Sequence, residues 1–455
     1  MNDLLILNGR VIDPANDIDT HQSLLILNGK VAALGAEADA KAPSDVKKID
    51  AKGLVVCPGL LDIHVHFREP GQSAKETIET GTRAAAQGGF TTVVCMPNTN
   101  PAIDSPGTVA LIQDKVEKSA VIHVYTTGAI TKGIAGEELA PIGSLHGAGV
   151  VAITDDGRCV QNNDLMRRAC EYAKMFDLPI MDHCQDYDLV GKGVMHEGHW
   201  SNVMGLPSWP AAGEEVIVAR NIQLAELTGT HIHCQHMSSA GAVKLIREAK
   251  DKGIPISGEA CAHHFTLTDA ALAGSNEFWP VDGKGLLDVI KMDYERPEWE
   301  NYNTLFKMNP PLRSGADRDA VLKGVADGTL EILASDHAPH CAYEKETEFD
   351  TAPFGITGLE TELALGVMRL YQTGMMSLSE LIRRWTVTPA KLVRLDKGTL
   401  SIGAAGDVTI FDPDEEWIYD RMKTPSKATN SPFHGWPLKG RNKYTVVNGK
   451  VIFGN

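Results

Sequence analysis

The chain has 455 residues, of which 43% are hydrophobic and 22% are charged, a balance typical of a folded globular protein and too apolar for disorder. Lysine and arginine number 43 against 59 aspartate and glutamate residues, which gives a formal net charge of −16. This charge argues against a nucleic-acid or anionic-membrane partner, because both require a basic protein surface.

Three features of the composition indicate a cytoplasmic protein. No apolar run approaches the roughly 20 residues of a membrane span, and the N-terminus lacks the basic and apolar regions of a signal peptide. The eight cysteines include no Cys-x-x-Cys pair. They are therefore a poor disulfide framework and a poor thiolate metal site, as expected in a reducing compartment.

The two ends of the chain carry the same pattern of short strands and turns. Strand-like sequence with an Asn-Gly turn occurs in residues 4–11, 24–34 and 444–453, and a further strand is predicted over residues 407–411. Isolated hairpins are only marginally stable, and chain termini usually lie close together. We therefore predict one small β-sandwich domain built from residues 1–55 and 395–455.

The middle of the chain, residues 56–394, alternates short apolar runs with helix-like stretches. Strands are predicted over residues 59–65, 91–96, 121–125, 150–153, 178–181, 230–234, 254–256 and 331–334, with helices over 75–87, 105–118, 164–175, 213–228 and 240–252. Eight strands interleaved with helices predict an α/β fold of the (β/α)8 TIM-barrel type. The alternative, an open doubly wound sheet, lacks an early Gly-x-Gly-x-x-Gly turn. Residues 274–306 predict a long loop insertion.

Ligand-type side chains follow five of these runs, at the face where barrel enzymes build their active sites. They are His64 and His66, Asp155 and Asp156, His183, His236, and Asp336. His64 and His66 are two residues apart on a strand, so both imidazoles point to the same side. Imidazoles together with carboxylates suit zinc and similar divalent ions. Each element alone is a weak signal, but the joint pattern predicts a metal centre.

The sequence resembles the cyclic amidohydrolases, and among them the dihydroorotase family of the longer bacterial type. The resemblance extends over residues 5–453 and is carried by residues 64–71 (HVHFREPG), 96–99 (MPNT), 308–313 (MNPPLR), 335–340 (SDHAPH), 353–356 (PFGI) and 358–361 (GLET). It implies a metal-dependent hydrolase that interconverts N-carbamoyl-L-aspartate and dihydroorotate in pyrimidine biosynthesis.

The resemblance also implies the ligands of two zinc ions. His64, His66 and Asp336 would hold one ion, His183 and His236 the second, and a carboxylate would bridge them. Many amidohydrolases use a carboxylated lysine as the bridge, but here the fourth run ends in two aspartates. The family spacing to His183 favours Asp156, with Asp155 left as the alternative. Because aspartate is shorter than a carboxylated lysine, one-metal occupancy stays open.

Further roles follow from the same resemblance. Asp336 would also be the catalytic proton carrier, while Arg68, Asn98 and His340 would bind the substrate carboxylate. Asn309 would contact the ring amide, and the backbone of Phe354 and Gly355 would pair with the ring edge. Residues 341–352 are charged, and we expect them to form a mobile cover over the site.

Several polar residues are assigned structural roles. His231 and His233 do not share strand parity with His236, so they are predicted to point away from the metals. His263 and His264 are given structural roles or roles behind the ligands, and Cys184 and Cys261 are predicted to be buried, inert thiols.

Two other functions stay open at this point. A hydantoinase or allantoinase would have the same fold but usually the lysine bridge and no arginine two residues after the metal pair. A catalytically inactive partner of aspartate transcarbamoylase would lose metal ligands, whereas all are present here. We expect a homo-oligomer that acts on a small molecule, with association with aspartate transcarbamoylase as a possibility.

Overall fold

The computed structural model describes residues 2–274, 280–281, 284–285, 291–294 and 297–454. The predicted insertion over residues 274–306 lies partly outside these described residues. Its described elements are strands β16 (Pro280–Val281) and β17 (Lys284–Gly285) and the 3-10 helix η4 (Thr304–Phe306). Within the described part of the chain, no helix combines the length and apolar character needed to cross a bilayer.

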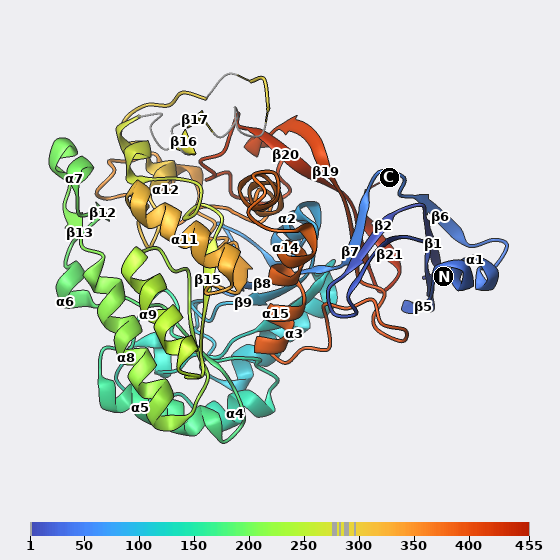
Figure 1. Cartoon of the computed structure of the whole chain (residues 1–455). Coiled ribbons are helices and arrows are strands. Elements are labelled where there is room, and N and C mark those ends of the chain that lie inside the picture. Colours follow the sequence, from blue (N-terminus) through green and yellow to red (C-terminus); the bar gives the residue numbers. More distant parts are fainter. Residues whose placement is uncertain (1, 275–279, 282–283, 286–290, 295–296, 455) are drawn as a thin grey trace.

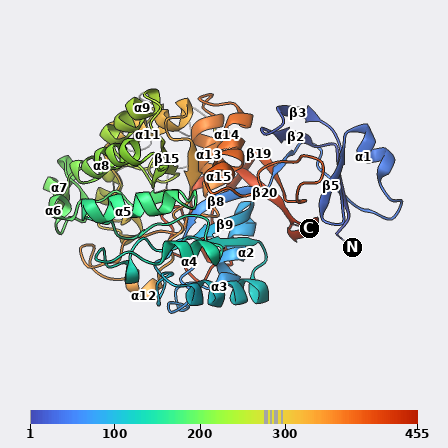
Figure 2. The ribbon, with the colours of Figure 1, turned by 90° about the horizontal axis from the view of Figure 1, so that it is seen from below.

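Strands from both ends of the chain lie together on one side of the molecule (Figures 1 and 2). One sheet has the order β5-β4-β1-β6, with β1 (Leu4–Leu7), β4 (Leu24–Leu27), β5 (Lys30–Leu34) and β6 (Lys47–Asp50). The other has the order β21-β20-β19-β7-β2-β3, with β2 (Arg10–Asp13), β3 (Ile18–His21), β7 (Val55–Pro58), β19 (Val408–Ile418), β20 (Pro437–Val447) and β21 (Lys450–Phe453). Helix α1 (Ala36–Lys41) follows β5.

A shared apolar cluster explains why these distant segments meet. Leu4 and Ile26 from the first sheet are buried in the same cluster as Val56, Ile410 and Val446 from the second. Burial of apolar surface drives this association, at roughly 25 cal/mol per Å². The two termini lie near each other in both views (Figures 1 and 2).

The Asn-Gly turns gave two correct predictions and one wrong one. Asn28 and Asn448, each followed by glycine, connect antiparallel strands β4–β5 and β20–β21, and both asparagines have positive φ as hairpin turns require. Asn8-Gly9 instead separates β1 and β2, which belong to different sheets. A left-handed residue turns the chain there, but the strands on either side pair with other partners.

The middle of the chain forms a continuous series of parallel pairings. Its strands are β8 (Leu60–Val65), β9 (Phe90–Cys95), β10 (His123–Thr126), β11 (Ile180–Asp182), β14 (Ile232–Cys234), β15 (Ile256–Cys261) and β18 (Ile332–Ala334). Ladders join β8 to β9, β9 to β10, β11 to β14, β14 to β15, and β15 to β18. Isolated parallel bridges of Ile153 to Gly128 and Ile180 connect the end of β10 to β11. A bridge from His337 to Val65 returns the series to β8.

Helices separate most of these strands. These helices are α2 (Ile78–Gly88), α3 (Pro106–Ser119), α4 (Ile142–Gly147), α5 (Asn163–Lys174), α8 (Ala212–Thr228), α9 (Ala240–Asp251) and α11 (Gly315–Asp327). Three more follow β18: α13 (Glu362–Gly366), α14 (Leu378–Trp385) and α15 (Val387–Leu392). Shorter elements are α6 (Tyr187–Val190), β12 (Met195–His196), α7 (His199–Met204), β13 (Ser208–Trp209) and α12 (Ala342–Lys345). Figure 1 shows α5, α8, α9 and α11 on the side away from the terminal strands.

Most predicted strands and helices agree with these bounds, with two exceptions. The strand predicted over residues 254–256 ends at Ile256, where β15 begins. The apolar pattern missed the rest of β15 because its next residues are polar or small. Residues 150–153 form bridges rather than a ladder. A second apolar cluster joins Leu61 of β8 with Met181 of β11, strands that do not pair with each other, and includes Ala390 of α15. This cluster therefore packs side chains of several central strands together with α15.

Candidate metal centre and substrate cavity

Four of the predicted metal ligands, from three separate segments of the chain, lie close together. His66 Nε2 lies 3.0 Å from Asp336 Oδ1 and 3.3 Å from Asp156 Oδ2. His64 Nε2 lies 3.3 Å from Asp156 Oδ1 and 3.5 Å from Asp336 Oδ1. Two features account for this convergence. Side chains alternate along a strand, so both imidazoles point to the same side, and the carboxyl ends of β8 and β18 lie together.

Two further histidines lie near the same aspartate. His183 Nδ1 lies 3.6 Å and His236 Nε2 3.7 Å from Asp156 Oδ1, and these two nitrogens are 2.8 Å apart. Asp156 is therefore adjacent to all four imidazoles. A carboxylate in this position has the geometry of a bridging ligand between two cations.

Asp155 faces a different part of the molecule. Its carboxylate accepts hydrogen bonds from the backbone N–H groups of Ile130, at 2.8 Å, and Thr131, at 3.0 Å, and from the Thr131 hydroxyl. Burial raises the pKa of Asp155 to about 6. Of the two neighbouring aspartates, only Asp156 lies among the histidines.

The cluster is a buried network of opposite charges. Burial by itself lowers the pKa of His64, but Asp156, Glu259 and Asp336 outweigh burial and hold it well above its ordinary value. The pKa of Asp156 lies well below its usual range because His64, His183 and His236 outweigh the effect of burial. Against the effect of burial, the neighbouring carboxylates also raise the pKa of His183, so a cation that binds here must displace protons from His64 and His183.

Several buried polar atoms in the cluster support a metal fit. Among the described residues, His64 Nε2, Asp156 Oδ1 and His236 Nδ1 have no hydrogen-bond partner. Buried polar atoms are normally paired, so several unpaired polar atoms within one buried cluster indicate that a bound group is missing there. His64, Asp156 and His236 each offer one ligand atom within 4.8 Å of the others, and so do His64, His66 and Asp336. These donors fit a divalent cation.

Three residues of the cavity wall have left-handed backbone. Arg68, His236 and Asp336 have φ angles of 59°, 38° and 45°. Non-glycine residues rarely adopt this left-handed region, and such strain is typical of functional sites, where neighbouring structure holds it in place.

The predicted substrate residues line one cavity together with the predicted ligands. The cavity has a volume of about 230 Å³, and the predicted residues in its wall are His66, Arg68, Asn98, Asp156, His183, His236, Asn309, Asp336, His340, Phe354 and Gly355. His64 is fully buried and is absent from this wall. Residues from eight segments of the chain therefore converge on one polar hollow.

Arg68 supplies a cation within this cavity. Its Nε donates to the carbonyl of Pro339 at 3.2 Å, which orients the guanidinium. Burial lowers the pKa of Arg68 to about 10, so the group remains charged at neutral pH. A buried guanidinium with donors left over is suited to a carboxylate.

The other predicted substrate residues have internal partners as well. Asn98 Oδ1 lies 2.8 Å from His66 Nδ1, so Asn98 also orients a predicted ligand. Asn309 Nδ2 donates to Gln185 Oε1 at 3.0 Å, while its Oδ1 is buried with no partner among the described residues. His340 Nε2 lies 2.8 Å from the carbonyl oxygen of Phe354. Each side chain is therefore held in place at the cavity wall.

Two residues that the sequence did not single out fix the loops around the cavity. Asn430 Nδ2 donates to the carbonyls of Ala338 and Gly355, both at 3.1 Å, and its Oδ1 accepts from the backbone N–H of His340 at 3.1 Å. The Nζ of Lys345, in the expected cover, donates to the carbonyls of Thr304 (3.2 Å), Lys307 (3.1 Å) and Pro353 (2.7 Å).

Two polar residues behind the ligands were also missed. Glu259 Oε1 lies 2.6 Å from His64 Nδ1 and accepts from the backbone N–H of His236 at 3.1 Å. His233, predicted to point away from the metals, is fully buried, and its Nε2 lies 3.0 Å from Glu259 Oε2 rather than among the predicted ligands. Gln185 Oε1 lies 2.8 Å from His183 Nε2. A buried glutamate within a strand was the available signal for Glu259.

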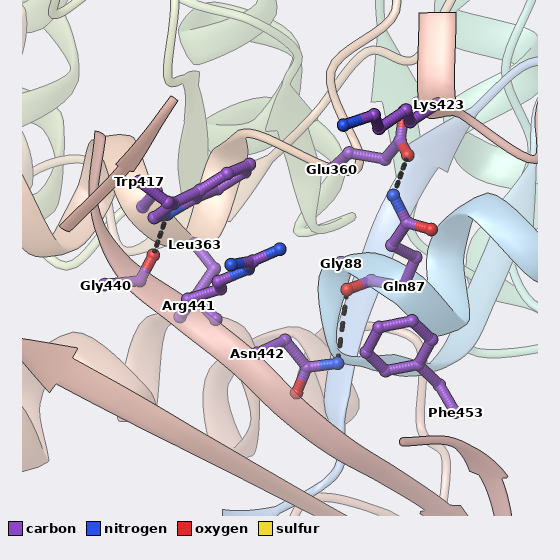
Figure 3. Close-up of a pocket in the computed structure, with 11 residues that line it drawn as sticks. Gln87, Gly88, Glu360, Leu363, Trp417, Lys423, Gly440, Arg441, Asn442 and Phe453 are labelled. Atoms are coloured by element: carbon purple, nitrogen blue, oxygen red, sulfur yellow. Dashed lines mark hydrogen bonds between the residues drawn. The ribbon is translucent and has the colours of Figure 1, made fainter. Parts of the chain in front are cut away.

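A separate cavity of about 270 Å³ lies between α2, α13 and the C-terminal strands (Figure 3). Figure 3 shows Gln87 directed at Glu360, and Gln87 Nε2 donates to Glu360 Oε1 at 2.6 Å. Burial raises the pKa of Glu360 to about 7. The walls of this cavity contain no predicted site residue, so the chemistry is assigned to the cavity with the histidines.

Comparisons with known proteins identify related sequences. A family model described as dihydro-orotase-like matches residues 53–242. A dihydroorotase from Citrifermentans bemidjiense is 47% identical over 450 residues, covering 99% of each chain. A dihydroorotase from Syntrophus aciditrophicus is 43% identical over 450 residues, again covering 99% of each chain.

Solved structures share the fold at lower identity. An L-hydantoinase (dihydropyrimidinase) from Arthrobacter aurescens superimposes with a TM-score of 0.83 at 23% identity, covering 100% of this chain and 96% of that chain. A dihydropyrimidinase from Brevibacillus agri gives a TM-score of 0.82 at 22% identity, covering 100% and 95%. At this identity the likeness concerns the mixed α/β architecture alone.

Proposed function

The chain belongs to the dihydroorotase family, and on this premise we propose that the histidine–aspartate cavity interconverts N-carbamoyl-L-aspartate and dihydroorotate. One observation carries the assignment of this cavity. A guanidinium, Arg68, lines the same 230 Å³ hollow as a carboxylate adjacent to four imidazoles. The substrate in either direction combines a carboxylate with an amide or ureido group. The guanidinium would bind the substrate carboxylate, and the histidine–aspartate cluster beside it would act on the amide or ureido group.

The proposed cofactor is a pair of zinc ions. His64, His66 and Asp336 would hold one, His183 and His236 the other, and Asp156 would bridge them. When bound, zinc polarises a carbonyl oxygen and lowers the pKa of a water molecule to near neutrality. The buried, unpaired His64 Nε2 and Asp156 Oδ1 support this assignment.

Asp336 is proposed to move the proton. In hydrolysis it would accept a proton from the attacking water and deliver it to the ring nitrogen as the carbon–nitrogen bond breaks. In cyclisation it would accept a proton from the ureido nitrogen as that nitrogen attacks the side-chain carboxyl carbon. It would pass this proton to the departing carboxyl oxygen, which takes a second proton from solvent and leaves as water. Its position in the cavity wall, 3.0 Å from His66, supports this role.

Arg68 is proposed to bind the substrate carboxylate, with Asn98 and His340 beside it. Asn309 and the backbone of Phe354 and Gly355 would hold the ring edge. The internal hydrogen bonds of these residues support fixed positions, which reduce the entropy lost when substrate is oriented.

The fold assignment is proposed at finer detail as well. Residues 56–394 would form a (β/α)8 barrel, supported by the closed series of parallel pairings. Residues 1–55 and 395–455 would form a β-sandwich, supported by the apolar cluster common to both terminal sheets. Homo-oligomerisation and association with aspartate transcarbamoylase remain predictions, which sedimentation of the chain alone and with that enzyme would test.

A turnover assay of the zinc-loaded protein with four substrates tests the function. Activity is expected with N-carbamoyl-L-aspartate and dihydroorotate and absent with hydantoin and allantoin. Activity with only the last two would contradict the proposal and favour a hydantoinase or allantoinase. Inactivity of the zinc-loaded chain with all four substrates, both alone and together with aspartate transcarbamoylase, would also contradict it and favour the inactive-partner alternative.

A further inference from the structure

A second group of metal-binding side chains lies at the end of β15. Cys261, His263 and His264 each offer one ligand atom within 4.8 Å of the others. All three side chains are at most 3% exposed. Cys261 is two residues beyond Glu259, the residue that contacts His64, so the group lies on the same strand but uses none of the ligands proposed above.

Two of the three side chains carry unpaired buried nitrogens. His264 Nε2 lies 2.9 Å from the carbonyl oxygen of Pro310, so Nε2 carries the proton and Nδ1 presents a lone pair. This Nδ1 and His263 Nε2 have no hydrogen-bond partner among the described residues. Histidines that bind metals typically donate their other ring N–H to a carbonyl or carboxylate, as His264 does.

The charge state of the imidazoles favours a cation. Burial lowers the pKa of His263 to about 4 and the pKa of His264 well below its ordinary value, so both rings are neutral at pH 7. Neutral imidazole is the form that binds a metal. The group therefore presents nitrogen lone pairs without the protons that would repel a cation.

The surrounding carboxylates act in the same direction. Burial, together with Asp336, Glu259, Glu362 and Asp62, holds the pKa of the Cys261 thiol well above its ordinary value. The negative potential that disfavours a thiolate also attracts a divalent cation, and a bound cation deprotonates a coordinating thiol.

We propose that Cys261, His263 and His264 form an additional zinc site, separate from the ions that Asp156 would bridge. One thiolate and two imidazoles match the preference of Zn²⁺ for tetrahedral sulfur and nitrogen ligands, and the fourth position would be taken by water or another small donor. This set replaces the inert thiol and structural histidines expected from the sequence.

X-ray absorption spectroscopy of the zinc-loaded native chain tests the proposal without any substitution. The histidine–aspartate centre supplies only nitrogen and oxygen ligands, so a sulfur scatterer at about 2.3 Å from zinc identifies the additional site. Cobalt(II) loading provides a second signal, a near-ultraviolet charge-transfer band from thiolate to cobalt. A native protein with neither sulfur scatterer nor band would overturn the proposal, whatever its activity.

Variants then assign the thiolate. Cys261→Ala should remove both signals and one equivalent of metal, measured by elemental analysis, while the remaining metal stays bound. Two matched controls are Cys184→Ala and Cys234→Ala, buried thiols that follow or end neighbouring strands. Both should retain the signals. Retention of the signals in Cys261→Ala, or their loss in Cys184→Ala, would overturn the assignment.

Discussion

His64 Nδ1 lies 2.6 Å from Glu259 Oε1, a contact that joins strands β8 and β15 across 195 residues of sequence. The carboxylate directs the other ring nitrogen, Nε2, toward Asp156 and Asp336. A carboxylate that holds the ring N–H of a ligating histidine fixes its tautomer and strengthens it as a ligand. Glu259 therefore orients a proposed metal ligand without reaching the cavity itself.

Replacement of this carboxylate should weaken metal binding. For Glu259→Gln we expect a loss of metal affinity of about 10- to 100-fold, because the amide no longer carries the charge that holds the His64 N–H. Competition with a chromogenic chelator measures this affinity. The control is Glu331→Gln. It makes the same chemical change just before the neighbouring strand β18, at a glutamate that pairs with Lys250. Equal affinity in Glu259→Gln and native protein would refute the orienting role.

Arg68 should control substrate binding rather than chemistry. Arg68→Met is expected to raise KM for N-carbamoyl-L-aspartate by about 10- to 100-fold, since a hydrogen-bonded charged group contributes about 1.5–3 kcal/mol. Arg68→Lys should recover only part of this, because an ammonium lacks the planar fork. Steady-state kinetics separates KM from kcat. The control, Arg83→Lys, changes an exposed arginine paired with Glu79 on α2. An unchanged KM in Arg68→Met would contradict carboxylate binding by this residue.

Asp336 should be required for turnover beyond its role as a ligand. Asp336→Asn retains an oxygen donor but cannot accept the proton, so kcat should fall by at least about 10²- to 10⁴-fold while most metal is retained. Metal analysis and turnover are measured on the same preparation. Normal turnover of Asp336→Asn would exclude the proton-transfer role. Complete loss of metal from this variant would show that Asp336 is needed as a metal ligand and would contradict the expected retention of metal.

Glu360, in the wall of the cavity in Figure 3, should make the stability of the folded chain depend on pH. Burial raises the pKa of Glu360 from 4.5 to about 7, so the folded state binds a proton more tightly than the unfolded state. The resulting stabilisation, about 3 kcal/mol at most, is complete below about pH 4.5 and is lost as pH rises through 7.

Glu360→Gln removes this titration while it keeps an acceptor for Gln87. The melting temperature of the variant should therefore rise relative to that of the native chain between pH 5 and pH 8. Thermal unfolding followed by circular dichroism at both pH values measures the difference. Glu79→Gln, an exposed change on α2, should show no such trend. A constant difference across this range for Glu360→Gln would contradict the buried proton.

The fold was predictable where the sequence pattern is local. Short apolar runs located β8, β9 and β18, and Asn-Gly turns located two hairpins, because strand burial and turn geometry depend on adjacent residues. The predicted strand ended too early in β15, because Ser257, Gly258 and Glu259 are polar or small although all three are buried. Asn8-Gly9 was misleading because the turn does not determine which strands pair.

The candidate site divides in the same way. The proposed ligands and Arg68 follow strand ends in recognisable motifs, so their convergence could be predicted from the sequence. Glu259 and Asn430 contact residues from other segments, as Gln185 does through Asn309, and their spacing along the chain has no recognisable pattern. Their roles depend on tertiary neighbours, which only the structure supplies.

The most direct test of the metal centre is a crystal structure of the zinc-loaded protein with anomalous data collected at the zinc edge. Two anomalous peaks are expected on either side of Asp156, one beside His64 and His66 and the other beside His183 and His236. An active, zinc-loaded protein with no anomalous peak in contact with Asp156 would contradict the proposed centre.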